Sequence, residues 1–287
     1  MSYKTILLHI DESSRLTERI GLAAALALQQ HSHLICVAMT GVSRFLYHNE
    51  LVDEQDPHLA LHLNYLRDKA RGLLHDCGPR LEQLGLRNVE QHVVDDDAGA
   101  GLSQQARCAD LVVIGQADPQ RANPVLLGDL AGHVVIHAGR PVLIVPHAAT
   151  PAAVPGRILI AWDGGKEAAR AVTAALPLLQ GAQRVHVAIF DPELNGMAHG
   201  EPPGTDLARY LARHGVGCEV VLRQSTKPGL FMAAPPVGPA LLTMAADLSC
   251  DLLVLGAYGH SRLRETLLGG VTRSVLETAT LPVLMAH

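Results

Sequence analysis

Aromatic residues are scarce in this chain: phenylalanine, tryptophan and tyrosine together make up 3% of its 287 residues. Few side chains are therefore available to stack on nucleic-acid bases. The formal net charge of −5 and the isoelectric point near 6.3 show no surplus of basic residues. Because phosphate backbones and anionic lipids are bound mainly by clustered lysine and arginine, we expect no nucleic-acid partner and no membrane partner.

Long apolar runs and cysteine pairs are also absent. The longest apolar stretch, near residues 21–28, is alanine-rich and far shorter than the roughly 18 residues of a membrane span. The five cysteines are scattered and never form a Cys-x-x-Cys pair, which argues against a disulfide framework and against a zinc knuckle. The first residues run directly into a strand pattern without the layout of a signal peptide. We therefore expect a soluble, cytoplasmic protein.

The most informative feature that is present is an internal repeat. The matched segments are Lys4–Asp11 with Arg157–Asp163, Asp110–Gly115 with Asp251–Gly256, and Arg140–His147 with Leu281–His287. The aspartates are 152 residues apart (163 − 11) but the glycines only 141 (256 − 115), so the second copy is shorter between its first and fourth strands. Residues 148–156 have the composition of a linker. We predict two domains, residues 1–150 and 151–287.

Each copy alternates short apolar runs with helical periodicity. Strands are predicted near residues 5–10, 33–39, 89–94, 111–115 and 142–146, and near 157–162, 184–190, 218–222, 252–256 and 283–286. Helices in the first copy are predicted over 15–30, 58–84, 99–108 and 128–138. Apolar strands without polar alternation favour a parallel sheet covered on both faces. The predicted fold class is α/β, with two tandem doubly wound open parallel sheets of five strands each.

The last strand of each copy begins at a proline and is followed by no helix that would shield the edge of the sheet. An exposed apolar edge strand invites aggregation. We therefore expect the two final strands to pair with each other, so that the domains pack as an intramolecular pseudo-dimer. The sequence leaves open whether two such chains associate further as a homodimer.

A glycine pattern follows the fourth strand of the second copy. Gly256, Gly259 and Gly269 have the spacing Gly-x2-Gly-x9-Gly, and Gly270, Val271 and Thr272 come next. Glycines at a strand end let the backbone approach a ligand closely. A helix that starts there presents N–H donors to an anion. Asp163, at the end of the first strand of this copy, is placed to accept hydrogen bonds from a ribose or a base.

This arrangement resembles the universal stress protein family, whose nucleotide-binding members carry Gly-x2-Gly-x9-Gly-Ser/Thr after the fourth strand and an aspartate after the first. The resemblance covers both copies and implies a Rossmann-like fold of the adenine nucleotide α-hydrolase kind. It implies that Asp163 contacts adenosine and Gly256 the ribose. The remaining motif residues would contact the phosphates of ATP or another adenine nucleotide, with or without Mg²⁺: Gly259, Gly269, Gly270, Val271 and Thr272. Gly270 departs from the pattern, because the family has a hydroxyl residue there.

The first copy has changed more at the corresponding positions. Gly115 and Gly128 keep the separation of the motif, but Asp118 replaces its second glycine and Asp129 its hydroxyl residue. A carboxylate at a helix N-terminus can cap that helix and would repel a phosphate. We predict that this copy binds no ATP. We expect Asp11 to have a structural role as a helix cap, with contact to a different ligand as the alternative.

The expected function is a binding or signalling module of the stress response, in which the second domain senses an adenine nucleotide. One alternative is a slow ATP hydrolase or phosphotransferase, and another is an interaction protein without nucleotide. No catalytic residue and no metal ligand is assigned. His133 and His137, four residues apart on a predicted helix, could share a metal, but the second copy has Ser274 and Thr278 there.

Overall fold

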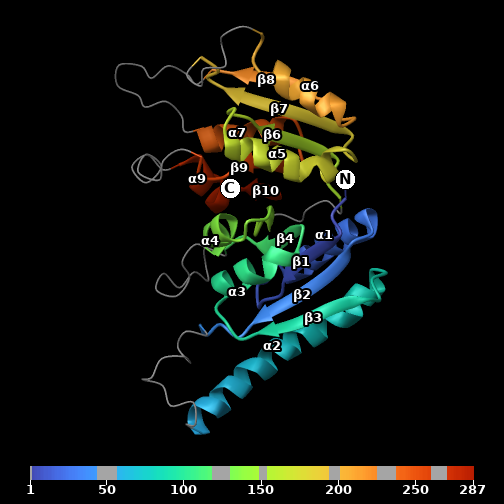
Figure 1. Ribbon diagram of the computed structural model, residues 1–287, viewed down its shortest axis with the longest axis vertical. Helices are drawn as coiled ribbons and strands as arrows, with labels where there is room; N and C mark the ends of the chain where they lie inside the picture. Colours follow the sequence, from blue (N-terminus) through green and yellow to red (C-terminus); the bar gives the residue numbers. More distant parts are fainter. Residues whose placement is uncertain are drawn as a thin grey trace. The chain divides into compact units, whose positions relative to one another are not determined.

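The computed structural model describes residues 2–43, 57–117, 130–148, 154–193, 201–224, 237–259 and 270–287 (Figure 1). The chain divides into two compact units, Ser2–Val142 and Leu143–His287. Each unit is built as a separate α/β domain. Several motif positions lie outside the described residues: Asp118, Gly128, Asp129 and Gly269.

The first domain is built on a parallel sheet with the strand order β3-β2-β1-β4. The strands are β1 (Thr5–His9), β2 (His33–Met39), β3 (Val89–Val94) and β4 (Leu111–Gly115). The next strand along the chain is β5 (Val142–Val145), and the boundary between the two compact units falls after its first residue. The central strands β1 and β4 are almost fully buried. That burial explains why they consist of apolar residues without polar alternation.

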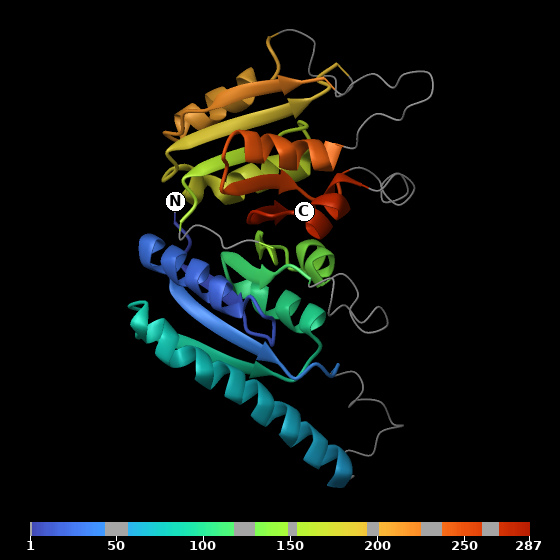
Figure 2. The same cartoon turned by 180° about the vertical axis from the view of Figure 1, so that it is seen from behind.

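Helices cover both faces of this sheet (Figures 1 and 2). The helices are α1 (Leu16–Gln30), α2 (Pro57–Gln83), α3 (Ala98–Gln105), the 3-10 turn η2 (Ala106–Cys108) and α4 (Leu130–His137). Helix α1 packs against α2 on one face, and α3 packs against α4 on the other.

The second domain repeats this plan with the strand order β10-β9-β6-β7-β8, again parallel throughout. Its strands are β6 (Arg157–Ala161), β7 (Arg184–Phe190), β8 (Glu219–Arg223), β9 (Leu252–Gly256) and β10 (Val283–Ala286). Its helices are α5 (Lys166–Leu179), α6 (Thr205–Arg213), α7 (Val237–Asp247) and α9 (Val271–Thr278). Helices α7 and α9 pack together, on the opposite face from α5.

The repeated Asp-Leu-hydrophobic segments have a structural cause. The Asp110 carboxylate accepts hydrogen bonds from the backbone N–H groups of Lys4 and Thr5, at 2.7 and 3.0 Å. In the second domain the Asp251 carboxylate accepts from Gly156 and Arg157, at 3.0 and 2.9 Å. In both domains, one aspartate before the fourth strand therefore fixes the start of the first strand.

The α/β fold with parallel sheets is confirmed, and the strands lie where the apolar runs predict them. In each domain the order of the strands reverses between the first strand and the fourth, at β1/β4 and at β6/β9. Ligands of doubly wound sheets bind at the carboxyl ends of the strands at such a reversal. Among the described residues, no helix has both the length and the apolar character needed to cross a membrane.

Candidate functional site

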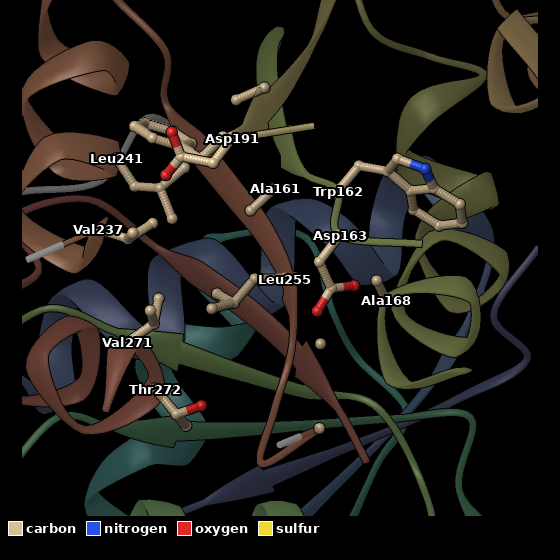
Figure 3. Close-up of a pocket in the computed structure, with 14 residues that line it drawn as sticks. Ala161, Trp162, Asp163, Ala168, Asp191, Val237, Leu241, Leu255, Val271 and Thr272 are labelled. Carbon is tan, nitrogen blue, oxygen red and sulfur yellow. The ribbon is translucent and has the colours of Figure 1, made fainter. Parts of the chain in front are cut away.

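A cavity of about 290 Å³ opens at the carboxyl ends of β6, β7 and β9 in the second domain. Asp163 follows β6 and extends into it, while Val271 and Thr272 reach it from the start of α9 (Figure 3). The remaining lining residues include Ala161, Trp162, Ala168, Ala188, Phe190, Asp191, Val237, Leu241 and Leu255. Its volume is near the lower end of the range found for small-molecule sites.

The structure brings most of the motif residues to this cavity. Asp163, Gly256, Gly259, Val271 and Thr272 line it. Two motif residues are not among the lining residues. Gly270 is the N-cap of α9, and Gly269 lies outside the described residues.

Asp163 is held by its own backbone turn. Its Oδ1 atom accepts a hydrogen bond from the backbone N–H of Gly165 at 2.8 Å, and the residue is exposed. This bond sets the direction of the carboxylate at the mouth of the cavity (Figure 3). Because ionised carboxylate oxygens only accept hydrogen bonds, the group suits a ligand that offers hydroxyl donors.

Gly256 and Gly259 are required by packing as well as by any ligand. A Cβ atom on Gly256 would overlap the backbone nitrogen of Ala168 and lie 2.6 Å from the carbonyl carbon of Glu167. A Cβ atom on Gly259 would lie 2.9 Å from Oε2 of Glu167, whose side chain is buried. The first turn of α5 therefore packs directly onto the end of β9, and this close approach shapes the floor of the cavity.

We predict that Gly256→Ala destabilises the second domain by about 1–3 kcal/mol, because the atoms that the methyl group would meet are backbone atoms and cannot rotate away. Gly217→Ala is the matched control, since a Cβ atom there meets nothing within 4 Å. Urea unfolding of the two variants measures the difference. Equal stability of the two variants would show that α5 can shift away from β9.

The two ends of the glycine motif are connected by a hydrogen bond. The backbone N–H of Tyr258 donates to Oγ1 of Thr272 at 3.2 Å, and Thr272 is only 2% exposed. Tyr258 has a positive φ of 57°, a conformation that is unusual for a residue with a side chain. The Thr272 hydroxyl therefore stabilises this turn, a role that the sequence motif alone does not indicate.

The start of α9 offers backbone donors to an anion. Its N-cap, Gly270, has no side chain and thus caps no N–H group of the first turn. The N-terminal N–H groups and the helix dipole together favour a negatively charged ligand. Val271 and Thr272, the first two residues of the helix, line the cavity, so these donors lie at its edge.

Two of the residues that line the cavity were not predicted as site residues. Trp162 is the only tryptophan in the chain, and Asp191 places a second carboxylate at the end of β7. Asp191 adopts a positive φ of 45°. Non-glycine residues in this conformation often cluster at functional sites. The position directly after an apolar strand was the one available signal, and it is the same signal that identified Asp163.

Within the described ranges, no group of three or more histidine, cysteine, aspartate or glutamate side chains is arranged to hold a metal ion. His133 and His137 stack with ring centroids 4.2 Å apart, and Nδ1 of His137 bonds to the carbonyl oxygen of His133 at 2.8 Å. This contact uses one ring nitrogen of the pair. All five cysteines are free thiols.

The corresponding region of the first domain contains an ion pair. Nη2 of Arg19 donates to Oδ1 of Asp11 at 2.5 Å, and the Arg19 side chain is 1% exposed. The backbone N–H of Ser13 donates to the same oxygen at 2.9 Å. Asp11 does not cap α1, because the N-cap of that helix is Arg15. The predicted structural role of Asp11 is therefore provided by an ion pair rather than by a cap.

Burial and charge shift the pKa values of this group. Burial alone would raise the pKa of Asp11, but the charges of Arg19 and His9 and the hydrogen bonds from Arg19 and Ser13 hold it well below its ordinary value. Burial lowers the pKa of His9 to about 4, against the opposing effect of Asp11. At neutral pH the group therefore contains a charged Asp11–Arg19 pair beside a neutral imidazole.

Comparison with known proteins gives one consistent result. The sequence model of the universal stress protein family matches residues 2–146 and again residues 155–287. A universal stress protein of Synechocystis is 42% identical over 45 residues, a match that spans 16% of each chain.

Two solved structures share the fold over nearly the whole chain. A universal stress protein from Archaeoglobus fulgidus superimposes with a TM-score of 0.71 at 16% identity, covering 98% of this chain and 95% of that one. A putative universal stress protein from Pseudomonas aeruginosa gives 0.59 at 17% identity, covering 99% and 93%. The chain therefore belongs to the universal stress protein family and carries two copies of the family domain in tandem.

Proposed function

We propose that the second domain binds an adenine nucleotide, with ATP as the first candidate and with or without Mg²⁺, and that it acts as a sensor in the stress response. The observation that carries the proposal is the cavity at the strand reversal. It has an exposed carboxylate, Asp163, on one side and the uncapped start of α9 on the other. A nucleotide has ribose hydroxyls to donate to the first and phosphates to accept from the second.

The apolar part of the cavity suits a base. Leu241 and Val237 from α7 and Phe190 from β7 line it together with Leu255 at the end of β9. An apolar lining of this kind suits the ring of a base, while the Asp191 carboxylate offers acceptors to an exocyclic amino group. The family match supports the same class of ligand, because the glycine spacing resembles that of the nucleotide-binding members.

Tryptophan fluorescence permits a direct test of ligand binding. Trp162 is the only tryptophan in the chain, and it is one of the residues that line the cavity. We expect ATP to change the tryptophan fluorescence of protein that has been unfolded and refolded to remove bound ligand. The change should saturate, and Asp163→Ala should weaken the apparent affinity at least about tenfold, which corresponds to one charge-assisted hydrogen bond.

Asp247→Ala serves as the control, since Asp247 is an exposed carboxylate at the end of α7 and is not among the lining residues. Wild-type affinity in Asp163→Ala would contradict the assigned site. If the wild type releases phosphate from ATP and Asp163→Ala abolishes that release, the alternative of a slow hydrolase is favoured.

Three further expectations stay predictions from the sequence. They are an interaction protein without nucleotide, an intramolecular pseudo-dimer in which the two final strands pair, and a further homodimer.

A further inference from the structure

The two domains can be compared position by position through their hydrogen bonds. The backbone N–H of Ile10 bonds to the carbonyl oxygen of Val37 at 2.8 Å, and that of Trp162 bonds to Ala188 at 2.9 Å. Residues 10 and 162 are therefore equivalent, and so are residues 37 and 188. The pattern of buried residues extends the same offset of 152 (162 − 10) through α1 and α5.

At four equivalent positions, a small residue of the second domain is a larger residue in the first. Ala161, Ala168 and Ala188 line the cavity of the second domain, and Ala171 is fully buried in α5. Their equivalents in the first domain are His9, Leu16, Val37 and Arg19. His9 is 4% exposed and Arg19 is 1% exposed. Both side chains are therefore directed into the domain rather than into solvent.

The Arg19 guanidinium lies between the two positions that would flank a ligand. It donates to Asp11, the equivalent of Asp163. It also occupies the place that a Cβ atom on Gly115, the equivalent of Gly256, would take. In the second domain that place is taken by the backbone of Glu167 and Ala168 instead. Oδ1 of Asp11 therefore accepts a charged donor from within the domain in addition to its turn bond from Ser13.

From these contacts we infer that the first domain is closed to ligand by its own side chains. The buried His9 ring stands at the position where the cavity of the second domain is lined only by the methyl group of Ala161, and the Arg19 guanidinium pairs with Asp11, the equivalent of Asp163. The two domains thus have separate roles, and the identity of residues 9 and 19 determines which one can accept an adenosine compound. This inference takes its ligand class from the proposed function but concerns residues that the proposed function does not use.

The test is the double variant His9→Ala/Arg19→Ala, which gives the first domain the two alanines of the second. Adenosine is the appropriate probe, because it lacks the phosphates that Asp118 and Asp129 are predicted to repel. Calorimetric titration of the refolded full chain should show one adenosine per chain in the wild type and two in the variant. The Trp162 signal should report only the site of the second domain in both proteins.

The possible results separate this inference from the proposed function. One site in both proteins overturns the inference and leaves the proposed function standing. No site in the wild type and one in the variant supports the inference and overturns the proposed function. No site in either protein overturns both.

A second variant applies if the double variant does not fold. His9→Ala alone removes a neutral ring and keeps the Asp11–Arg19 pair. Free imidazole should then refill the vacated space and raise the Tm of His9→Ala, without raising that of the control His33→Ala, whose ring is already 39% exposed in the wild type. No increase in the Tm of His9→Ala would show that its ring occupies no space a ligand can enter, and would overturn the inference.

Discussion

Replacing Asp11 by alanine should lower the free energy of unfolding by about 3–5 kcal/mol, the cost of breaking a buried ion pair by removing one partner. The Arg19 side chain is 1% exposed and would be left as a buried charge without its carboxylate. Within the part of the chain that the structure describes, its Nε and Nη1 atoms have no hydrogen-bond partner that could compensate. Urea unfolding followed by far-ultraviolet circular dichroism measures the loss.

The second domain provides the matched control. Asp163 is equivalent to Asp11, makes the same turn bond to the residue two positions on, and is exposed. Asp163→Ala should therefore cost no more than about 1 kcal/mol, the value of one partly solvated hydrogen bond. Equal losses in the two variants would mean that the Arg19 pair contributes nothing beyond the turn.

Acidification should destabilise the first domain well before its carboxylates protonate. The pKa of His9 falls from 6.5 to about 4 on folding. Between these two values the unfolded chain binds a proton that the folded chain does not, so the free energy of unfolding falls as the pH falls. At about 1.4 kcal/mol for each pKa unit, the loss across this window is about 3 kcal/mol.

His9→Gln removes this titration and should flatten the same part of the stability profile. Asp11 changes stability at lower pH, because its folded-state pKa lies below the unfolded value of about 3.9. Its contribution is present above that value and is lost as the pH falls below it. The experiment compares urea unfolding at pH 6.5 and at about pH 4 in both proteins. A wild-type loss no larger than that of His9→Gln would show that His9 is protonated in the fold.

The sequence was sufficient to predict the fold because the physical signals are local. Buried parallel strands such as β4 and β9 must be apolar along their whole length, and the aspartate before each must bond to the start of the first strand. Both constraints are visible in the sequence as residue types, and each of them occurs in both copies of the repeat. The motif residues at the strand ends follow from the same logic, since parallel strands carry their ligands at one end.

The remaining features of the site depend on contacts between distant segments. Nothing in the sequence around Arg19 indicates that its guanidinium reaches Gly115, because an arginine in a helix is usually exposed. The cavity is open where Ala161 and Ala188 are small, and a small residue has no pattern of its own. From the sequence, the loss of the first site is attributed to Asp118 and Asp129. The structure adds the ion pair between Asp11 and Arg19.

The central claim is that the second domain alone binds an adenine nucleotide, and calorimetric titration of refolded wild-type protein with ATP and magnesium tests it most directly. We expect saturable binding at one nucleotide per chain in the wild type. Asp163→Ala should bind ATP with a greatly weakened affinity, and Asp11→Asn should still bind one nucleotide per chain. Binding of two nucleotides, or saturable binding that Asp163→Ala leaves intact, would contradict the assignment to the second domain. Absence of binding in the refolded wild type would contradict nucleotide sensing altogether.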